Sequence, residues 1–104
     1  MTQELAVAAM GDIPGWFSKD EGAVLYRAAR AALLQGSLIL EIGSFQGRST
    51  IISGHAALDD GMGAKVYAVD PHEGNLTSKS VAPTYAQFLS NVLAAGVSTA
   101  IAPV

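Results

Sequence analysis

The chain has 104 residues, of which half are hydrophobic and only 14% are charged, and its formal net charge is −3. This composition excludes a disordered chain and suits one small domain with a well-buried α/β core. Nucleic acid is not expected as a partner, because phosphate binding needs clustered Lys and Arg, and no basic block is present. The absence of Cys excludes disulfides and thiolate metal sites and fits a cytoplasmic location.

Residues 1–17 are predicted to form an N-terminal helix and a loop. Residues 2–10 are Ala-rich and carry no Lys or Arg, so the basic start of a signal peptide is missing. Residues 11–17 contain two Gly and one Pro and should form the loop, with Trp16 and Phe17 anchoring it on the core. A lid over a bound ligand is the alternative role for these two aromatic residues. No apolar run approaches the ~18 residues of a membrane span, so no membrane partner is expected.

A longer helix is predicted to begin after Ser18. Ser18 and Glu21 match a capping box, with Ser18 as N-cap and Glu21 at position N3. The helix should run to about residue 35, where Gly36 provides the C′ stop. Its apolar positions at helical spacing predict one core stripe, made of Val24, Leu25, Ala28, Ala32 and Leu33.

Strands and helices then alternate along the chain. Residues 38–42 form a continuous apolar run with one acid, which is typical of a strand buried on both faces of a parallel sheet. A helix over 48–58 follows, in which His55 should be at the surface or half-buried. A second strand is predicted over 65–69, ending at Asp70.

The last part of the chain continues this alternation. A polar loop over 71–82 precedes Pro83, which suits the first turn of a helix that reaches residue 95. Gly96 should stop this helix, and residues 99–102 look like the start of a third strand. Alternating strands and helices imply right-handed crossovers and a parallel sheet.

The predicted fold class is therefore α/β, a Rossmann-like parallel sheet with flanking helices, truncated after about three strands. Residues 18–104 would form the first half of this domain. The strand over 38–42 should be central in a complete domain, yet the chain offers it no partner on one side. We therefore expect a fragment that aggregates or forms a homo-oligomer through the exposed sheet edge.

The most informative stretch covers residues 41–50 and reads Glu-Ile-Gly-Ser-Phe-Gln-Gly-Arg-Ser-Thr. A strand, a glycine turn and a helix start gather backbone N–H groups at one point, which suits an anionic or carboxylate-bearing ligand. The phosphate loop G-x-x-x-x-G-K-[ST] does not fit, because the gap between Gly43 and Gly47 is one residue short and Arg48 replaces Lys. The dinucleotide fingerprint G-x-G-x-x-G fits poorly, since the tight turn lacks its second glycine.

The stretch resembles the first motif of class I S-adenosylmethionine-dependent methyltransferases, in the E-x-G-x-x-x-G-x-S form of catechol-type O-methyltransferases and their bacterial relatives. Residues 66–70, Val-Tyr-Ala-Val-Asp, are similar to the family's second strand with its terminal acid. Residues 70–74, Asp-Pro-His-Glu-Gly, and 84–89, Thr-Tyr-Ala-Gln-Phe-Leu, are similar to the loop and helix of bacterial members. The resemblance covers roughly residues 13–104, the N-terminal half of such an enzyme.

This resemblance implies an enzyme that transfers a methyl group from S-adenosylmethionine to a small-molecule substrate, with oxygen as the expected acceptor atom. The fragment alone would be inactive, and no catalytic residue can be named in it. A divalent metal is an option only for the complete protein, and no metal ligand is predicted here. The cofactor-binding residues implied are Glu41 for the ammonium group, Gly43, Ser44, Phe45 and Gly47 in the turn, Ser49 for the carboxylate, Asp70 for the ribose, and Pro71 and His72 beside the adenine.

Other interpretations remain open at this point. An NAD-dependent Rossmann oxidoreductase fragment and a non-catalytic nucleotide-binding module are the alternative functions. Glu41 could bond a neighbouring backbone N–H, and Asp70 could be an ordinary turn residue. Ser49 and Thr50 could be helix caps.

Three side chains near these motifs have simpler expected roles. His72 and Glu73 should be solvated in an exposed loop, since an isolated pair lacks the ligand count of a metal site. Arg48 could do no more than pair with a nearby acid.

Overall fold

The computed structural model describes residues 3–72 and 84–104, and it confirms the predicted α/β fold with a parallel sheet. The sheet has the order β1-β2-β3, and both of its strand pairs are parallel. Ile39 of β1 lies opposite Val66 of β2, which lies opposite Ile101 of β3. The elements are α1 (Gln3–Met10), α2 (Lys19–Leu34), β1 (Ile39–Ile42), α3 (Arg48–Asp60), β2 (Val66–Val69), α4 (Tyr85–Ala94), a 3₁₀ turn (Ser98–Ala100) and β3 (Ile101–Pro103).

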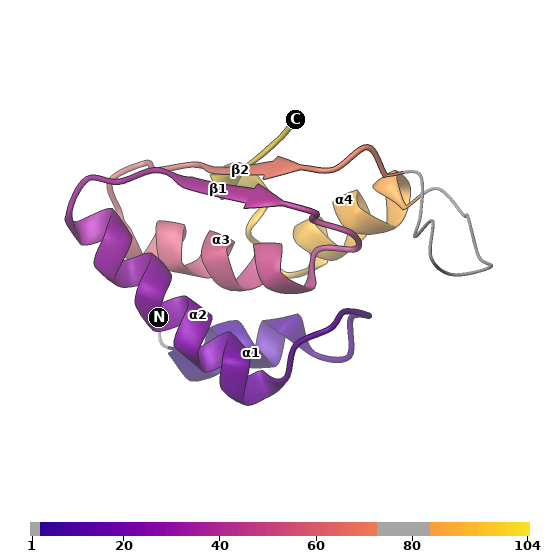
Figure 1. The fold of residues 1–104 in the computed structure, drawn as a ribbon, viewed down its shortest axis with the longest axis horizontal. Helices are drawn as coiled ribbons and strands as arrows, with labels where there is room; N and C mark the ends of the chain where they lie inside the picture. The colour runs from indigo at the N-terminus through magenta and orange to yellow at the C-terminus, as the bar shows by residue number, and fades with distance from the viewer. Residues whose placement is uncertain (1–2, 73–83) are drawn as a thin grey trace.

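All the helices lie on one side of the sheet (Figure 1). Both connections join parallel neighbours in the same direction across the sheet, and connections of one hand then bring α3 and α4 to the same face. In β1, Ile39 and Glu41 are partly buried on this face, whereas Leu40 and Ile42 point away and Ile42 is 80% exposed. The prediction that residues 38–42 are buried on both faces is therefore wrong, because no helix covers the second face within the described residues.

Helix α3 is the centre of the core. Its residues 50–57 are all buried, because the sheet covers one side and α1 and α2 cover the other (Figure 1). The prediction of a surface or half-buried His55 is wrong, since its side chain is only 5% exposed. Met10, Ile51, Ile52 and Phe88 are among the largest fully buried side chains, and all four belong to one hydrophobic cluster.

Helix α2 begins as predicted and buries a different face. The Glu21 N–H donates to Ser18 Oγ at 3.1 Å and the Ser18 N–H donates to Glu21 Oε1 at 3.0 Å, which completes the capping box. The predicted core stripe is confirmed at Leu33, which is buried, and at Leu25, which is partly buried against the core, whereas Val24 is 57% exposed. The buried stripe consists of Gly22, Tyr26, Ala29 and Leu33.

Tyr26 fixes this orientation of α2. Its hydroxyl donates to Asp59 Oδ2 of α3 at 2.5 Å. Burial and this hydrogen bond raise the pKa of Tyr26 to about 12. Arg30 adds a second link, with its Nη1 3.8 Å from Asp60 Oδ1.

The predicted start of the third helix at Pro83 lies outside the described residues, as does most of the predicted polar loop over 71–82. The described part of this helix, α4, ends before Gly96, whose φ of +76° agrees with the predicted stop. Within residues 3–72 and 84–104, each helix is too short or too polar to cross a bilayer.

Candidate functional site

The turn between β1 and α3 covers residues 43–47 and stands at the carboxyl end of the sheet. Gly43 adopts φ +86°, and its N–H donates to the Val69 carbonyl at 2.8 Å, which extends the pairing of β1 with β2. Ligands of open parallel sheets bind outside the carboxyl ends of the strands, so this is the expected edge for a site. Asn91 of α4 supports the turn, because its Nδ2 donates to the Gln46 carbonyl at 2.9 Å.

Asp70 joins this turn to the end of β2. Its Oδ2 accepts the Phe45 N–H at 2.7 Å and its Oδ1 accepts the His72 N–H at 2.7 Å. Phe45 has φ +50° and His72 has φ +56°, the two positive values at non-glycine positions in the described part of the chain. One carboxylate therefore holds both strained residues, and the turn role considered for Asp70 is present in the structure.

Glu41 takes part in a hydroxyl cluster at the start of α3. Its Oε2 accepts a hydrogen bond from Ser49 Oγ at 2.5 Å, and its Oε1 accepts one from Thr50 Oγ1. Neither hydroxyl caps the helix, and the alternative of a backbone N–H partner for Glu41 is also wrong. The N-cap residue is Gly47, so no side chain among the described residues caps the first N–H groups of α3.

Residues 11–17, which we call the strap, cross the front of α3 and are held there by Arg48. Arg48 Nε donates to the Phe17 carbonyl at 2.8 Å, and Nη1 donates to the carbonyls of Gly11 at 3.1 Å and Ile13 at 2.9 Å. Its guanidinium carbon also lies 5.2 Å from the centre of the Phe17 ring. The expected pairing of Arg48 with an acid is therefore replaced by three backbone carbonyls.

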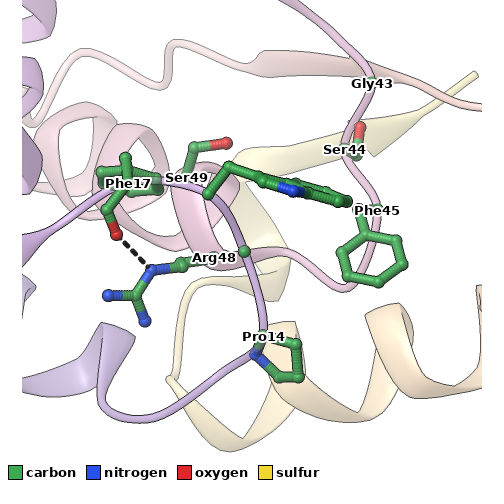
Figure 2. Close-up of a pocket in the computed structure, with 9 residues that line it drawn as sticks. Pro14, Phe17, Gly43, Ser44, Phe45, Arg48 and Ser49 are labelled. Atoms are coloured by element: carbon green, nitrogen blue, oxygen red, sulfur yellow. Dashed lines mark hydrogen bonds between the residues drawn. The ribbon is translucent and has the colours of Figure 1, made fainter. Parts of the chain in front are cut away.

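The strap and the turn enclose a pocket of about 190 Å³ (Figure 2). Trp16 is 75% exposed, and its ring centre lies 5.2 Å from that of Phe45. The prediction that Trp16 anchors the strap is thus wrong, whereas Phe17 is partly buried against the core. The lining residues are Pro14, Gly15, Trp16 and Phe17 from the strap, Gly43, Ser44 and Phe45 from the turn, and Arg48 and Ser49 from α3.

Ser44 is the polar residue of this lining that lacks a partner. It is only 2% exposed, and its Oγ makes no hydrogen bond within the described residues. A buried hydroxyl without a partner costs about 1–3 kcal/mol. The hydrogen-bonding capacity of this hydroxyl is therefore unused within the described residues.

Four of the nine predicted cofactor residues line the pocket: Gly43, Ser44, Phe45 and Ser49. Glu41 stands one hydrogen bond behind Ser49. The lining does not include Gly47, Asp70, Pro71 or His72. Gly47 instead lies against α4, since a Cβ there would come 3.3 Å from the Phe88 ring.

His72 has a different environment from the one predicted. Its side chain is buried, and its Nδ1 lies 3.0 Å from Thr84 Oγ1. Its ring packs 5.1 Å from Tyr85 and 5.0 Å from Phe88, centre to centre. The prediction of a solvated His72 is therefore wrong, and Glu73 lies outside the described residues. Nowhere in the described ranges do three His, Asp or Glu side chains gather as a metal site would require.

Sequence reasoning gave no site role to Pro14, Gly15 or Arg48, and made a lid only the second choice for Trp16 and Phe17. The usable signal was an aromatic pair directly after Pro-Gly, because such a turn is a surface feature and its aromatic residues need a partner there. Gly15 is required for close approach, since a Cβ would come 2.5 Å from Arg48 Cδ.

A scan against models of known protein families finds no match for this chain, and a search of the curated proteins finds none either. The functional argument therefore depends on the geometry of the strap, the turn and the start of α3.

Proposed function

We propose that this chain provides the cofactor-binding half of an S-adenosylmethionine-dependent methyltransferase that acts on a small molecule. The observation that carries the proposal is the buried, unpartnered hydroxyl of Ser44 in a pocket that also borders the uncapped start of α3. Such a site favours a carboxylate, and the α-carboxylate of this cofactor is a suitable group. When bound, the cofactor would supply an electrophilic methyl group, and the chain would bind and orient it.

The size of the pocket indicates which end of the cofactor it takes. Drug-sized ligands occupy pockets of about 300–1,000 Å³, whereas this pocket has about 190 Å³. It therefore suits the methionine end of the cofactor, with the nucleoside outside the described lining. Glu41 stands behind Ser49, and its carboxylate retains acceptor capacity beyond the two hydroxyls, which suits the ammonium group.

Asp70 is the residue that we assign to the ribose. Each of its oxygens accepts one backbone N–H, and a carboxylate can accept about four hydrogen bonds in all. The ribose hydroxyls would use the remaining capacity. In this assignment Asp70 both shapes the turn and binds the ligand, so the two roles that the sequence left open are compatible.

The proposal is tested by titrating the chain with S-adenosylmethionine, S-adenosylhomocysteine and NADH in separate calorimetric experiments. We expect the two adenosyl compounds to bind and NADH not to bind. Trp16, as the one Trp in the sequence, also gives a direct fluorescence signal from the pocket. Binding of NADH alone would support the oxidoreductase alternative, and no binding at millimolar ligand would contradict the proposal.

A Ser44→Ala variant separates a ligand contact from a structural role. Because the hydroxyl has no protein partner, its removal should leave stability unchanged or slightly raised, while affinity falls about tenfold. Ser37→Ala is the matched control, since Ser37 is exposed and lies outside the pocket. A loss of stability without a loss of affinity would contradict the assigned role.

The biological setting follows from the same proposal. A cytoplasmic location is consistent with the proposed cofactor and with the absence of Cys from the sequence. Strand β1 stands at the edge of the sheet, so self-association through that edge belongs to the proposal as well.

A further inference from the structure

The pocket lining contains three aromatic rings, those of Trp16, Phe17 and Phe45, and no carboxylate. Trp16 from the strap and Phe45 from the turn come together from segments that are distant in the sequence. Glu41, the acid assigned above to the ammonium group, stands behind Ser49 and outside this lining. A positive charge that enters the pocket would therefore meet aromatic rings first.

The backbone segments that carry the two rings are held in place by polar contacts. Arg48 fixes the strap through the carbonyls of Gly11, Ile13 and Phe17, on either side of Trp16. Asp70 fixes Phe45 in its left-handed conformation. The pair is thus organised before any ligand arrives, which lowers the entropy that binding must overcome.

The geometry of the pair excludes a planar group between the rings. The ring centres are 5.2 Å apart and the planes are tilted by 49°. A base between two rings needs about 7 Å, because each aromatic contact requires about 3.5 Å. The rings therefore form a corner, and a compact group beside them can approach both.

Arg48 is a cation in the same lining, so the position of its guanidinium group matters for a second cation in this corner. Its Nε and Nη1 bond the strap carbonyls and its guanidinium lies against Phe17. Figure 2 shows the guanidinium group turned away from Phe45. Aromatic faces attract a cation whose centre lies within about 6 Å of the ring centre.

We propose that Trp16 and Phe45 form a cation-selective corner that recognises the sulfonium group of S-adenosylmethionine. This inference rests on the proposed function and assigns Trp16 as a specificity-determining residue of the same site. The corner favours the positively charged cofactor relative to S-adenosylhomocysteine, in which the sulfur is a neutral thioether. The other contacts of the pocket are common to the two ligands.

The test measures the dissociation constants of S-adenosylmethionine and S-adenosylhomocysteine by calorimetry on the full chain. The ratio of the two constants is then compared between the wild type and each variant. Replacing the indole in Trp16→Leu keeps an apolar side chain and removes the π face. We expect this variant to weaken the binding of S-adenosylmethionine about threefold to thirtyfold more than the binding of S-adenosylhomocysteine. Trp16→Phe, which keeps a π face, should restore most of the difference. Trp16 is exposed, so both variants should fold as the wild type does.

Tyr67→Leu is the matched control, because it removes an exposed ring on the open face of the sheet, away from the pocket. It should leave both dissociation constants unchanged. If Trp16→Leu loses the same affinity for both ligands, the cation-selective role of the corner is contradicted, and the proposed function is unaffected. If neither ligand binds the wild type, the proposed function is overturned and the corner with it.

Discussion

The Oδ2 atom of Asp70 accepts the backbone N–H of Phe45 at 2.7 Å, which fastens the turn after β1 to the end of β2. The other oxygen of the same carboxylate holds His72. Two residues with positive φ thus depend on one side chain. The position of the Phe45 ring, and hence one wall of the pocket, is set from the neighbouring strand.

Replacing Asp70 with Ala should lower the free energy of unfolding by about 1–3 kcal/mol, because both strained residues lose their acceptor. Urea denaturation followed by circular dichroism measures the effect. Asp12→Ala, at an exposed position, is the control and should leave the transition midpoint unchanged. An unaltered midpoint for Asp70→Ala would show that the two turns hold their conformation without the carboxylate.

Replacing Arg48 with Lys should release the strap, because a single ammonium group cannot reproduce the fork that reaches three carbonyls. The expected result is faster tumbling of the Trp16 side chain, measured as lower fluorescence anisotropy and stronger acrylamide quenching. Arg27→Lys is the matched control, since Arg27 is exposed and bonds only Gln3 among the described contacts. Equal anisotropy in the two variants would argue that packing, not Arg48, holds the strap.

Tyr26 should ionise at a higher pH than a free phenol. Burial first, and then the hydrogen bond to Asp59, raise its pKa to about 12. An ultraviolet titration should therefore show a phenol that ionises near pH 12, and Tyr26→Phe should remove that step. Because the fold favours the neutral phenol, this contribution to stability is lost as pH rises above the unfolded value. A titration without that step would contradict the buried hydrogen bond.

His55 should make the fold sensitive to acid. Burial lowers the pKa of its side chain below 6.5, although a backbone hydrogen bond with Ala95 acts in the opposite direction. The unfolded chain therefore takes up a proton more readily than the fold does, and stability should fall as pH drops through and below 6.5. Neighbouring Asp59 opposes this shift but does not reverse it.

The measurement for His55 is urea denaturation between about pH 8 and pH 5, compared with His55→Leu. The variant has an apolar side chain of similar size, so its stability should depend less on pH over this interval. If the two pH profiles run parallel, groups other than His55 control the acid sensitivity.

Local signals in the sequence predicted the elements well. The capping box at Ser18 and the glycine turn after β1 depend on residues within a few positions of one another, and both occur in the structure. The buried face of α2 could not be predicted in this way. Its orientation depends on Tyr26 meeting Asp59, 33 positions further along the chain.

The site was predicted only in part for the same reason. Ser44 and Phe45 follow from the motif itself, whereas the strap contributes through Arg48, whose carbonyl acceptors are 31 to 37 positions away. The one-sided sheet was also missed, because an apolar run has the same appearance whether one face or two faces are covered. Whether helices cover one face or both faces of the sheet depends on the direction of the crossovers, and no single segment of the sequence determines that direction.

The one-sided sheet has a consequence for local opening of the molecule. Strand β1 is both an edge strand and half-covered, so its amide hydrogens should exchange with solvent before those of α3. Since β1 leads directly into the turn that carries Ser44 and Phe45, such opening dismantles the pocket while the core remains folded. A ligand that occupies the pocket would therefore slow amide exchange in β1, although it touches only the residues that follow the strand.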